Sequence, residues 1–365
     1  MTTRRQFLTQ GSLAMLGFCA TQAVSDDAAG PRLPDGSASK DMITPEAQKA
    51  IDRGLDYLAA NQHANGSFGE RQYNGNVAVT SLAALAFMAG GQQPGRGARG
   101  RLVYDALRYV LSKEHPRTPG FLYHALGSPH GPMYSHGFGT LFLAEVHGMV
   151  PDLRLRQETR EKLERAVRLI INTQNSEGGW RYQPRREDAD ISVTVCQIMA
   201  LRAARNAGLG VPKRTVEECI KYVKACQHHD GGFRYMKQGG PTAFARTAAG
   251  VAALYSAGVY QGHEIKAGLE YLMRYKPNPN RFPFHRDVPD LHYFYGHYYA
   301  AQSMWTAGGR YWSEWFPAIR DELVARAVRY RPDGAWSDSI CSHYATAMAC
   351  VILQLPNNYL PIMQK

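Results

Sequence analysis

The chain has 365 residues, of which 44% are hydrophobic and 20% charged, so it can bury a large core and is not a disordered polypeptide. Its formal net charge of +11 favours anionic surroundings, such as a membrane face, an acidic polysaccharide or a phosphorylated substrate, although the same charge can serve solubility alone. No motif or cluster of basic and aromatic residues accompanies this charge, so nucleic acid is not an expected partner.

The N-terminus carries the pattern of an export signal. Arg4 and Arg5 precede a modestly apolar stretch at residues 13–19, and small residues around Ala23 offer a cleavage site. Residues 1–23 are therefore predicted to be a twin-arginine signal peptide, which would place the protein in the periplasm or outside the cell. The apolar stretch is too short for a permanent anchor, so any membrane association is expected to be peripheral.

The folded part is predicted to begin soon afterwards. Residues 24–43 are rich in Asp, Gly, Pro and Ser and lack an apolar period, which predicts a flexible linker. Thr44, followed by a proline, offers a helix cap, so a single domain is predicted over residues 44–365. A second helix start is predicted at the capping box formed by Thr215 and Glu218.

A short motif recurs along this domain and marks repeated helical hairpins. In each full copy, a glutamine is followed by a glycine four residues later and by an aromatic residue six residues later. Full copies begin at Gln62, Gln174 and Gln227, and weaker copies contain Phe121, Phe284 and Trp336. An amphipathic helix precedes each copy, and the glycine is expected to end that helix as a left-handed C-terminal cap.

A second kind of helix follows each copy and is apolar on nearly every side, as at residues 247–254 and 346–353, which is typical of a helix buried all round. The equivalent positions are Thr80, Thr140, Thr194, Thr247, Tyr299 and Thr346, which gives six units. Six such pairs predict an all-α fold: an (α/α)6 toroid of six helix-hairpin repeats, with an inner ring of parallel helices surrounded by outer helices. An open superhelical solenoid is the alternative.

These repeats resemble the QW repeats of squalene and oxidosqualene cyclases and the related repeats of protein prenyltransferase β subunits. Length and export signal are similar to those of bacterial prenyltransferase/squalene oxidase repeat-containing proteins, a group named for its fold. In squalene-hopene cyclases a Gly-Gly-Trp segment precedes an Asp-x-Asp-Asp motif that protonates the substrate. Here the segment ending at Trp180 precedes Asp188 and Asp190, which match the first and third motif positions. The resemblance implies a terpene cyclase-like enzyme, an isomerase or transferase, with Asp190 as general acid and Asp188 tuning it.

The chain also departs from these enzymes. Ile191 stands where the fourth carboxylate of the motif belongs, and one toroid replaces the two of squalene cyclases. The zinc site of protein prenyltransferases uses an Asp, a Cys and a His, of which alignment keeps only the His. A metal held by His297, His343 and a nearby carboxylate is chemically feasible, but the lost ligands favour no metal. The sequence indicates no particular cofactor and no required partner subunit.

Because the inner helices are expected to be parallel, their N-termini gather at one mouth that favours an anion. Asp188 and Asp190 are the candidate catalytic residues at this mouth. The candidate substrate-binding residues are His136, Arg246, Tyr295, His297 and His343. The alternative reading is structural: Asp190 caps a helix, and the histidines bond to loop backbone.

Three functions stay open. The first is an enzyme or binding protein that takes a small apolar, isoprenoid or anionic ligand into a central cavity. The second is a non-catalytic toroid that binds a protein or polymer through its mouth, which the incomplete aspartate motif favours. The third is a lyase acting on acidic polysaccharide, with Arg246 as base and Asp188 and Asp190 holding calcium, because some pectate lyases are also α/α toroids.

Overall fold

The computed structural model describes residues 39, 41–129, 131–277, 292–330 and 333–364. The chain divides into two compact units, Met1–Arg32 and Leu33–Lys365, and every described residue belongs to the second. The predicted signal at 1–23 and nearly all of the predicted linker at 24–43 lie outside the described residues, as does the weak repeat copy around Phe284. No helix in the described part has the length and apolarity to cross a bilayer.

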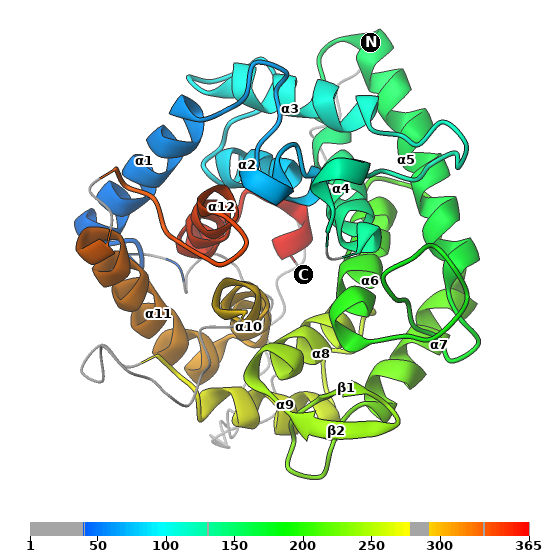
Figure 1. The fold of residues 1–365 in the computed structure, drawn as a ribbon. Helices are drawn as coiled ribbons and strands as arrows, with labels where there is room; N and C mark the ends of the chain where they lie inside the picture. Colours follow the sequence, from blue (N-terminus) through cyan, green and yellow to red (C-terminus); the bar gives the residue numbers. More distant parts are fainter. Residues whose placement is uncertain (1–38, 40, 130, 278–291, 331–332, 365) are drawn as a thin grey trace, which may run out of the picture. The chain divides into compact units, whose positions relative to one another are not determined.

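Twelve α-helices in the described ranges alternate between an outer and an inner layer of a ring (Figure 1). The outer helices are α1 (Pro45–Ala60), α3 (Gly100–Ser112), α5 (Leu153–Thr173), α7 (Lys213–Ala225), α9 (His263–Met273) and α11 (Gly309–Tyr330). The inner helices are α2 (Val77–Ala89), α4 (Pro132–His147), α6 (Ile191–Asn206), α8 (Phe244–Ser256), α10 (Tyr293–Ala307) and α12 (Ser342–Leu353). Short 3-10 helices are η3 (Arg71–Tyr73), η4 (Ala125–Gly127), η6 (Leu355–Asn357) and η7 (Pro361–Met363).

The ring is closed. Each inner helix packs against the next one, and the last, α12, packs against both α2 and α1 of the first hairpin. The strands of the described part, β1 (Arg234–Met236) and β2 (Gly239–Thr242), form one antiparallel hairpin in which Arg234 pairs with Thr242 and Met236 with Gly239. The predicted all-α toroid of six hairpins is therefore confirmed, and the open solenoid is not observed.

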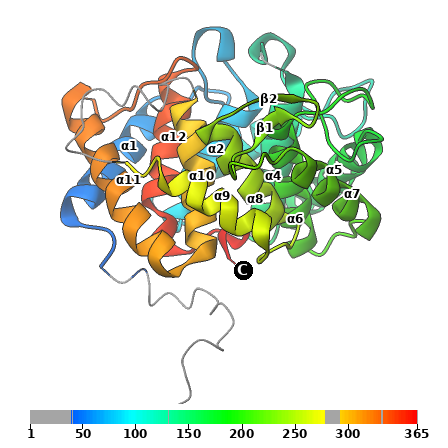
Figure 2. The ribbon, with the colours of Figure 1, turned by 90° about the horizontal axis from the view of Figure 1, so that it is seen from below.

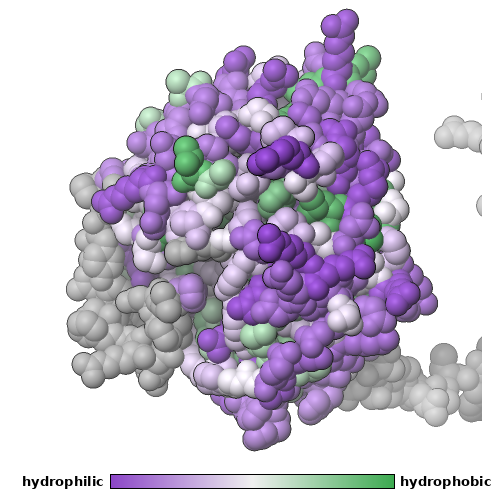
Figure 3. Space-filling view, turned by 45° about the vertical axis from the view of Figure 1, so that its right-hand side comes forward, coloured by the Kyte–Doolittle hydropathy of each residue, from purple (hydrophilic) through white to green (hydrophobic). Residues whose placement is uncertain are grey.

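Burial explains why the two layers differ in sequence. Inner helices such as α2 and α12 are buried almost throughout and consist of small and apolar residues. Outer helices bury one stripe only; in α5 it includes Leu163, Val167 and Ile170, while the opposite face is charged. The surface in Figure 3 is accordingly hydrophilic over most of its area, with small hydrophobic patches.

The glycine of the repeat motif shapes the turn between the layers rather than ending the outer helix, which corrects the expectation of a C-terminal cap. Helix α5, for example, ends at Thr173, five residues before the motif glycine. In five repeats this glycine has φ between +85° and +98°, and a Cβ on it would collide with a backbone carbonyl of the next outer helix. These are Gly66, Gly120, Gly178, Gly231 and Gly334, the last of which lies against Arg53 of α1. Only glycine permits that conformation together with so close an approach, so the motif joins neighbouring hairpins.

The motif glutamine forms a second link between hairpins. Nε2 of Gln174 donates to the carbonyl of Gly178 at 2.9 Å and to that of Thr215, near the start of α7, at 2.8 Å. Gln62 and Gln227 make the same pair of bonds to their own turns and to the next outer helix. One side-chain amide thus satisfies a turn carbonyl and a carbonyl in the first turn of the following helix.

The inner helix holds the aromatic residue of the motif. The backbone N–H of Trp180 donates to Oγ1 of Thr194 at 3.1 Å, and the same bond recurs at Phe68, Phe233 and Trp336. In the second repeat Nδ1 of His136 accepts the N–H of Leu122 at 3.3 Å, so His136 and not Thr140 occupies the equivalent place. The predicted alignment was therefore wrong by one helical turn in that repeat.

One predicted helix start is confirmed and one is wrong. Oγ1 of Thr44 accepts the N–H of Ala47 at 3.2 Å, so Thr44 caps α1 as predicted. Helix α7 instead begins at Lys213, directly after Pro212, so the predicted capping box at Thr215 lies inside the helix. The fixed φ of proline suits the residue before a helix, and the buried Thr215 is used through its carbonyl by Gln174.

Candidate functional site

The first turns of the inner helices lie at one end of the toroid, where the β1–β2 hairpin also lies (Figure 2). This arrangement arises because each inner helix follows its outer helix through the same type of turn. We call this end the mouth. Asp190, the residue before α6, is a fully buried carboxylate at the mouth, with a side-chain exposure of 0%.

Asp190 uses its two carboxyl oxygens differently. Oδ1 accepts hydrogen bonds from the backbone N–H of Ser192 at 2.8 Å, from the N–H of Val193 at 2.9 Å, and from the Ser192 hydroxyl. Oδ2 is buried and receives no hydrogen bond from the described residues. The side chain therefore caps the helix with one oxygen, as the structural reading predicts, while the other oxygen faces Arg181.

Burial raises the pKa of Asp190 above its ordinary value of 3.8, because desolvation of the charged form outweighs the hydrogen bonds from Ser192 and Val193, the attraction of Arg181 and the nearby Tyr235 hydroxyl, all of which lower it. Compared with water, the site shifts the equilibrium toward the protonated form, while the same donors stabilise the carboxylate once a proton has left. A carboxyl in such surroundings can act as a general acid.

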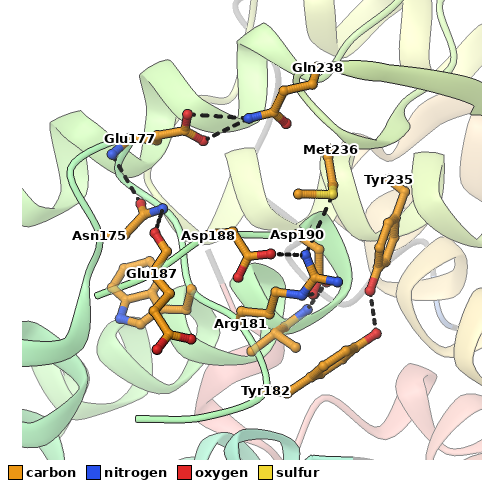
Figure 4. A network of polar contacts seen from close by, with 12 residues as sticks. Asn175, Glu177, Arg181, Tyr182, Glu187, Asp188, Asp190, Tyr235, Met236 and Gln238 are labelled. Atoms are coloured by element: carbon orange, nitrogen blue, oxygen red, sulfur yellow. Dashed lines mark hydrogen bonds and ion pairs between the residues drawn. The ribbon is translucent and has the colours of Figure 1, made fainter. Parts of the chain in front are cut away.

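Arg181 connects the two candidate aspartates (Figure 4). Its guanidinium forms an ion pair with Asp188, and its Nε lies 3.8 Å from Oδ2 of Asp190. Asp188 is half exposed, so this pair is open to solvent on one side. Arg181 thus links the half-exposed Asp188 to the buried Asp190.

Tyrosines surround this carboxyl. The hydroxyls of Tyr182 and Tyr235 are hydrogen-bonded to each other (Figure 4), and the Arg181 guanidinium lies over both rings. Because the Ser192 hydroxyl donates to Asp190, its oxygen accepts the hydrogen bond from the Tyr134 hydroxyl at 2.6 Å. Tyr295 of α10 donates to the Ser192 carbonyl at 3.0 Å. Residues from α4, α6, α10 and the β-hairpin thus meet around Asp190.

Arg246 lies at the rim of the same cluster. Its guanidinium carbon is 5.6 Å from the centre of the Tyr235 ring, and its Nη1 donates to the carbonyl of Pro241 at 2.8 Å. Four of the predicted site residues, Asp188, Asp190, Arg246 and Tyr295, are therefore brought into one neighbourhood. The three histidines are not part of it.

His136 and His297 are buried in apolar surroundings. The His136 ring packs on Phe121 while its Nδ1 accepts the N–H of Leu122, so the side chain fastens a repeat turn. His297 packs among Phe244, Tyr293 and Trp315. Burial lowers the pKa of each histidine to about 3, which keeps both rings neutral.

His343 belongs to the seam between the first and last hairpins. Its Nδ1 accepts the N–H of Gly69 at 2.9 Å, and its Nε2 lies 3.7 Å from Oε1 of Glu70. The second oxygen of Glu70 accepts the N–H of Ser342 at the start of α12. His343 and His297 thus contact different elements, and no group of three metal-ligating side chains occurs among the described residues.

Four residues of this site were not predicted from the sequence: Arg181, Tyr134, Tyr182 and Tyr235. A signal for three of them was present: the motif aromatic is followed by Arg-Tyr in two successive repeats, at 181–182 and at 234–235. Equivalent positions of adjacent repeats are neighbours in a ring, which is why Tyr182 and Tyr235 meet. Tyr134 carried no comparable signal.

A closed ring of six hairpins with a buried carboxyl at its mouth defines an α/α toroid protein. The chain belongs to the prenyltransferase alpha-alpha toroid domain family, whose model matches residues 37–280.

Individual relatives are more distant. The chain is 27% identical over 189 residues to a drimenyl diphosphate synthase from Streptomyces showdoensis. The match covers 51% of this chain and 32% of that protein, so the chain spans about a third of the length of this relative.

Solved structures share the fold at low identity. A type II terpene cyclase from Scytonema, solved with its substrate geranylgeranyl dihydroxybenzoate, matches with a TM-score of 0.57 at 12% identity, over 87% of this chain and 98% of its own. A cellobiose 2-epimerase from Bacillus thermoamylovorans matches with a TM-score of 0.62 at 12% identity, over 86% and 99%. The same fold thus serves isoprenoid and sugar chemistry, and the function has to be argued from the site.

Proposed function

We propose that this protein is a terpene cyclase-like enzyme that binds an isoprenoid at its mouth and protonates it with Asp190. Membership of the family and the likeness to a drimenyl diphosphate synthase and to a type II terpene cyclase support the class of reaction. They leave the substrate open, and the residues around Asp190 carry the finer part of the proposal.

The observation that carries the proposal is the state of the Asp190 carboxyl. It is completely buried, its pKa is raised by burial, and its Oδ2 receives no hydrogen bond from the described residues. A proton on Oδ2 is therefore free to leave toward a bound carbon–carbon double bond. The O–H bond breaks as a C–H bond forms, which leaves a carboxylate on Asp190 and a carbocation on the isoprenoid. After ring closure the cation is neutralised when a carbon next to it releases a proton to a base such as water.

The neighbouring residues assist this step in two ways. The donors to Oδ1 and the Arg181 charge stabilise the carboxylate that remains, which makes the protonated form a stronger acid. Burial raises the pKa of Tyr134 and of Tyr295 well above the ordinary value, so their hydroxyls stay neutral beside the reacting group. Arg246, at the rim, is suited to contact an anionic end of the substrate.

Export by the twin-arginine pathway remains part of the proposal, because the signal lies outside the described residues. Cell fractionation of the full chain and of an Arg4→Lys, Arg5→Lys variant tests it. Recovery of both forms in the same compartment would contradict this part.

The proposed reaction is tested by incubating the purified protein with linear isoprenoids, with and without a diphosphate, in D2O. A proton-initiated cyclisation is expected to give a product that carries one deuterium on carbon, detected by mass spectrometry and NMR. No conversion, or a product without deuterium, would contradict the proposal. Native mass spectrometry of the same mixtures separates the alternatives: binding without conversion supports the non-catalytic toroid. Cleavage of an acidic polysaccharide with new unsaturated ends would support the lyase.

A further inference from the structure

The end of the toroid opposite the mouth is covered by residues 354–364, which we call the C-terminal segment. It follows α12 and contains η6 and η7. In Figure 1 the label C lies inside the ring of inner helices, and in Figure 2 it lies at the end opposite the β-hairpin. The segment therefore runs across the C-terminal ends of the inner helices.

Hydrogen bonds fasten the segment to four inner helices besides α12. Gln354 donates to the carbonyl of Ala86 at 3.0 Å, and Asn357 donates to that of Ala89 at 3.1 Å, both in α2. Trp305 of α10 donates from Nε1 to the carbonyl of Met363 at 3.0 Å. Arg202 of α6 donates to the carbonyl of Gln364 at 2.9 Å, and Glu145 of α4 accepts the N–H of Ile362 at 3.1 Å.

Apolar side chains of the segment complete the cover. Leu355, Leu360, Ile362 and Met363 are all buried. A cavity of about 20 Å³ remains between the segment and helices α8 and α10. The hydroxyl of Ser303, which lines this cavity, has no hydrogen-bond partner among the described residues. The cavity has room for about one water molecule.

Glu145 is the buried acid beneath the segment. Glu145 is 4% exposed, and its Oε2 accepts the N–H of Ile362 at 3.1 Å. The charged and titratable groups found to interact with it are Arg202 of α6, which attracts the carboxylate, and the Tyr298 hydroxyl of α10. Arg202 itself is engaged with the segment, because its Nη2 donates to the carbonyl of Gln364 at 2.9 Å.

We propose that the C-terminal segment is a pH-dependent plug on the toroid and that Glu145 is its latch, closed when the carboxyl is protonated and loosened when it ionises. The proposal rests on the docking of the segment over a buried carboxyl and is independent of the chemistry at the mouth. Its consequence is that the end of the toroid away from Asp190 opens as the pH rises.

The direction follows from the protonation equilibrium. Burial raises the pKa of Glu145 from 4.5 to about 8 while the segment is docked, although the Ile362 N–H and Arg202 oppose this shift. When the segment lifts, the carboxyl gains water and its pKa returns toward 4.5. Between these two values the open form has lost its proton and the closed form has kept it. Opening therefore becomes more favourable with rising pH, by up to about tenfold per pH unit.

Hydrogen exchange of the full-length protein measures this opening. Protection factors, which are corrected for the intrinsic exchange rate, are followed for the amides of residues 358–364 between pH 5 and pH 9. In the wild type they are expected to fall by up to about tenfold per pH unit until they level off near the raised pKa. The Glu145→Gln variant is expected to keep high protection over the whole range.

Control variants separate a latch from a general loss of packing. Glu322→Gln removes another buried acid, in α11, and is expected to leave the pH dependence unchanged. Ile362→Ala is expected to lower protection at every pH without changing the slope. Arg202→Gln removes the opposing charge and is expected to move the plateau to higher pH, which keeps the proposal testable if Glu145→Gln fails to fold. The proposal would be overturned by wild-type protection factors that do not change with pH, or by a Glu145→Gln variant whose protection changes with pH as steeply as that of the wild type.

Discussion

Asp190→Asn is expected to lower the rate of isoprenoid conversion by about 10²–10⁴-fold, the usual contribution of a general acid, while the toroid stays folded. Asparagine is as good a helix cap as aspartate, so its side-chain oxygen can keep the bonds from Ser192 and Val193. The amide has no acidic proton to give. The measurement is the initial rate of deuterated product formation by the variant and the wild type, together with their circular dichroism.

Two comparisons make this result interpretable. Asp152→Asn makes the same change at the cap of α5, whose Asp152 accepts the N–H of Leu155, and should leave the rate unchanged. Asp188→Asn removes the ion pair with Arg181 and should lower the rate of isoprenoid conversion less than Asp190→Asn does. Equal rates for Asp190→Asn and the wild type would leave Asp190 as a helix cap only.

Asp190→Asn also has an expected effect on the stability of the fold. The pKa of Asp190 is raised in the folded state, so the stability of the wild type falls as the pH rises from the unfolded value of 3.8 through the folded value. Asp190→Asn removes this penalty. Its melting temperature at pH 7 should therefore be no lower than that of the wild type, in contrast to its activity.

Trp180→Ala is expected to lower the free energy of unfolding by about 3–5 kcal/mol, the typical cost of deleting a large buried aromatic side chain. Trp180 is 1% exposed, and its Nε1 donates to the carbonyl of Ile170 at 2.7 Å. The alanine variant would leave a cavity behind the turn that precedes Asp190 and would remove one of the donors to the Ile170 carbonyl, which keeps the Thr173 hydroxyl at 3.2 Å. Urea unfolding monitored by circular dichroism measures the loss.

Trp180→Phe is the matched comparison. Phenylalanine occupies the equivalent place in other repeats, at Phe68 and Phe233, where it is fully buried. The phenylalanine variant should lose less stability than the alanine variant, because only the indole N–H and part of the volume are missing. A loss below about 1 kcal/mol for Trp180→Ala would show that the turn is held by its backbone alone.

The architecture was predictable from the sequence because the residues that determine each helical hairpin recur along the chain. The docking glycine recurs in five turns, three of which carry the full Gln-Gly-aromatic spacing, and the inner helices are largely apolar because neighbouring helices cover them on nearly every side. Local details were less predictable. The start of α7 was set by Pro212 and not by the capping box at Thr215, and His136 replaced threonine in one turn.

The site was predictable only in part, for a physical reason. Asp190 stood out through its spacing from the Trp180 segment, but residue type alone could not separate it from the histidines at similar positions. All three residues are buried, and their surroundings separate them: His136 and His297 face apolar packing, whereas Asp190 faces Arg181 and tyrosines. Tyr134 joins the site through a hydrogen bond to Ser192, 58 residues away in sequence, and no local pattern reports such a contact.

The most direct test of the proposed acid is the pKa of the Asp190 carboxyl, measured by ¹³C NMR titration of aspartate-labelled protein and assigned with Asp190→Asn. We expect the resonance lost in that variant to titrate above the ordinary value of 3.8, because burial disfavours the carboxylate. A resonance that titrates at or below 3.8 would mean that Arg181 and the helix N-terminus hold the group ionised. In that case Asp190 would cap α6 without serving as a proton donor.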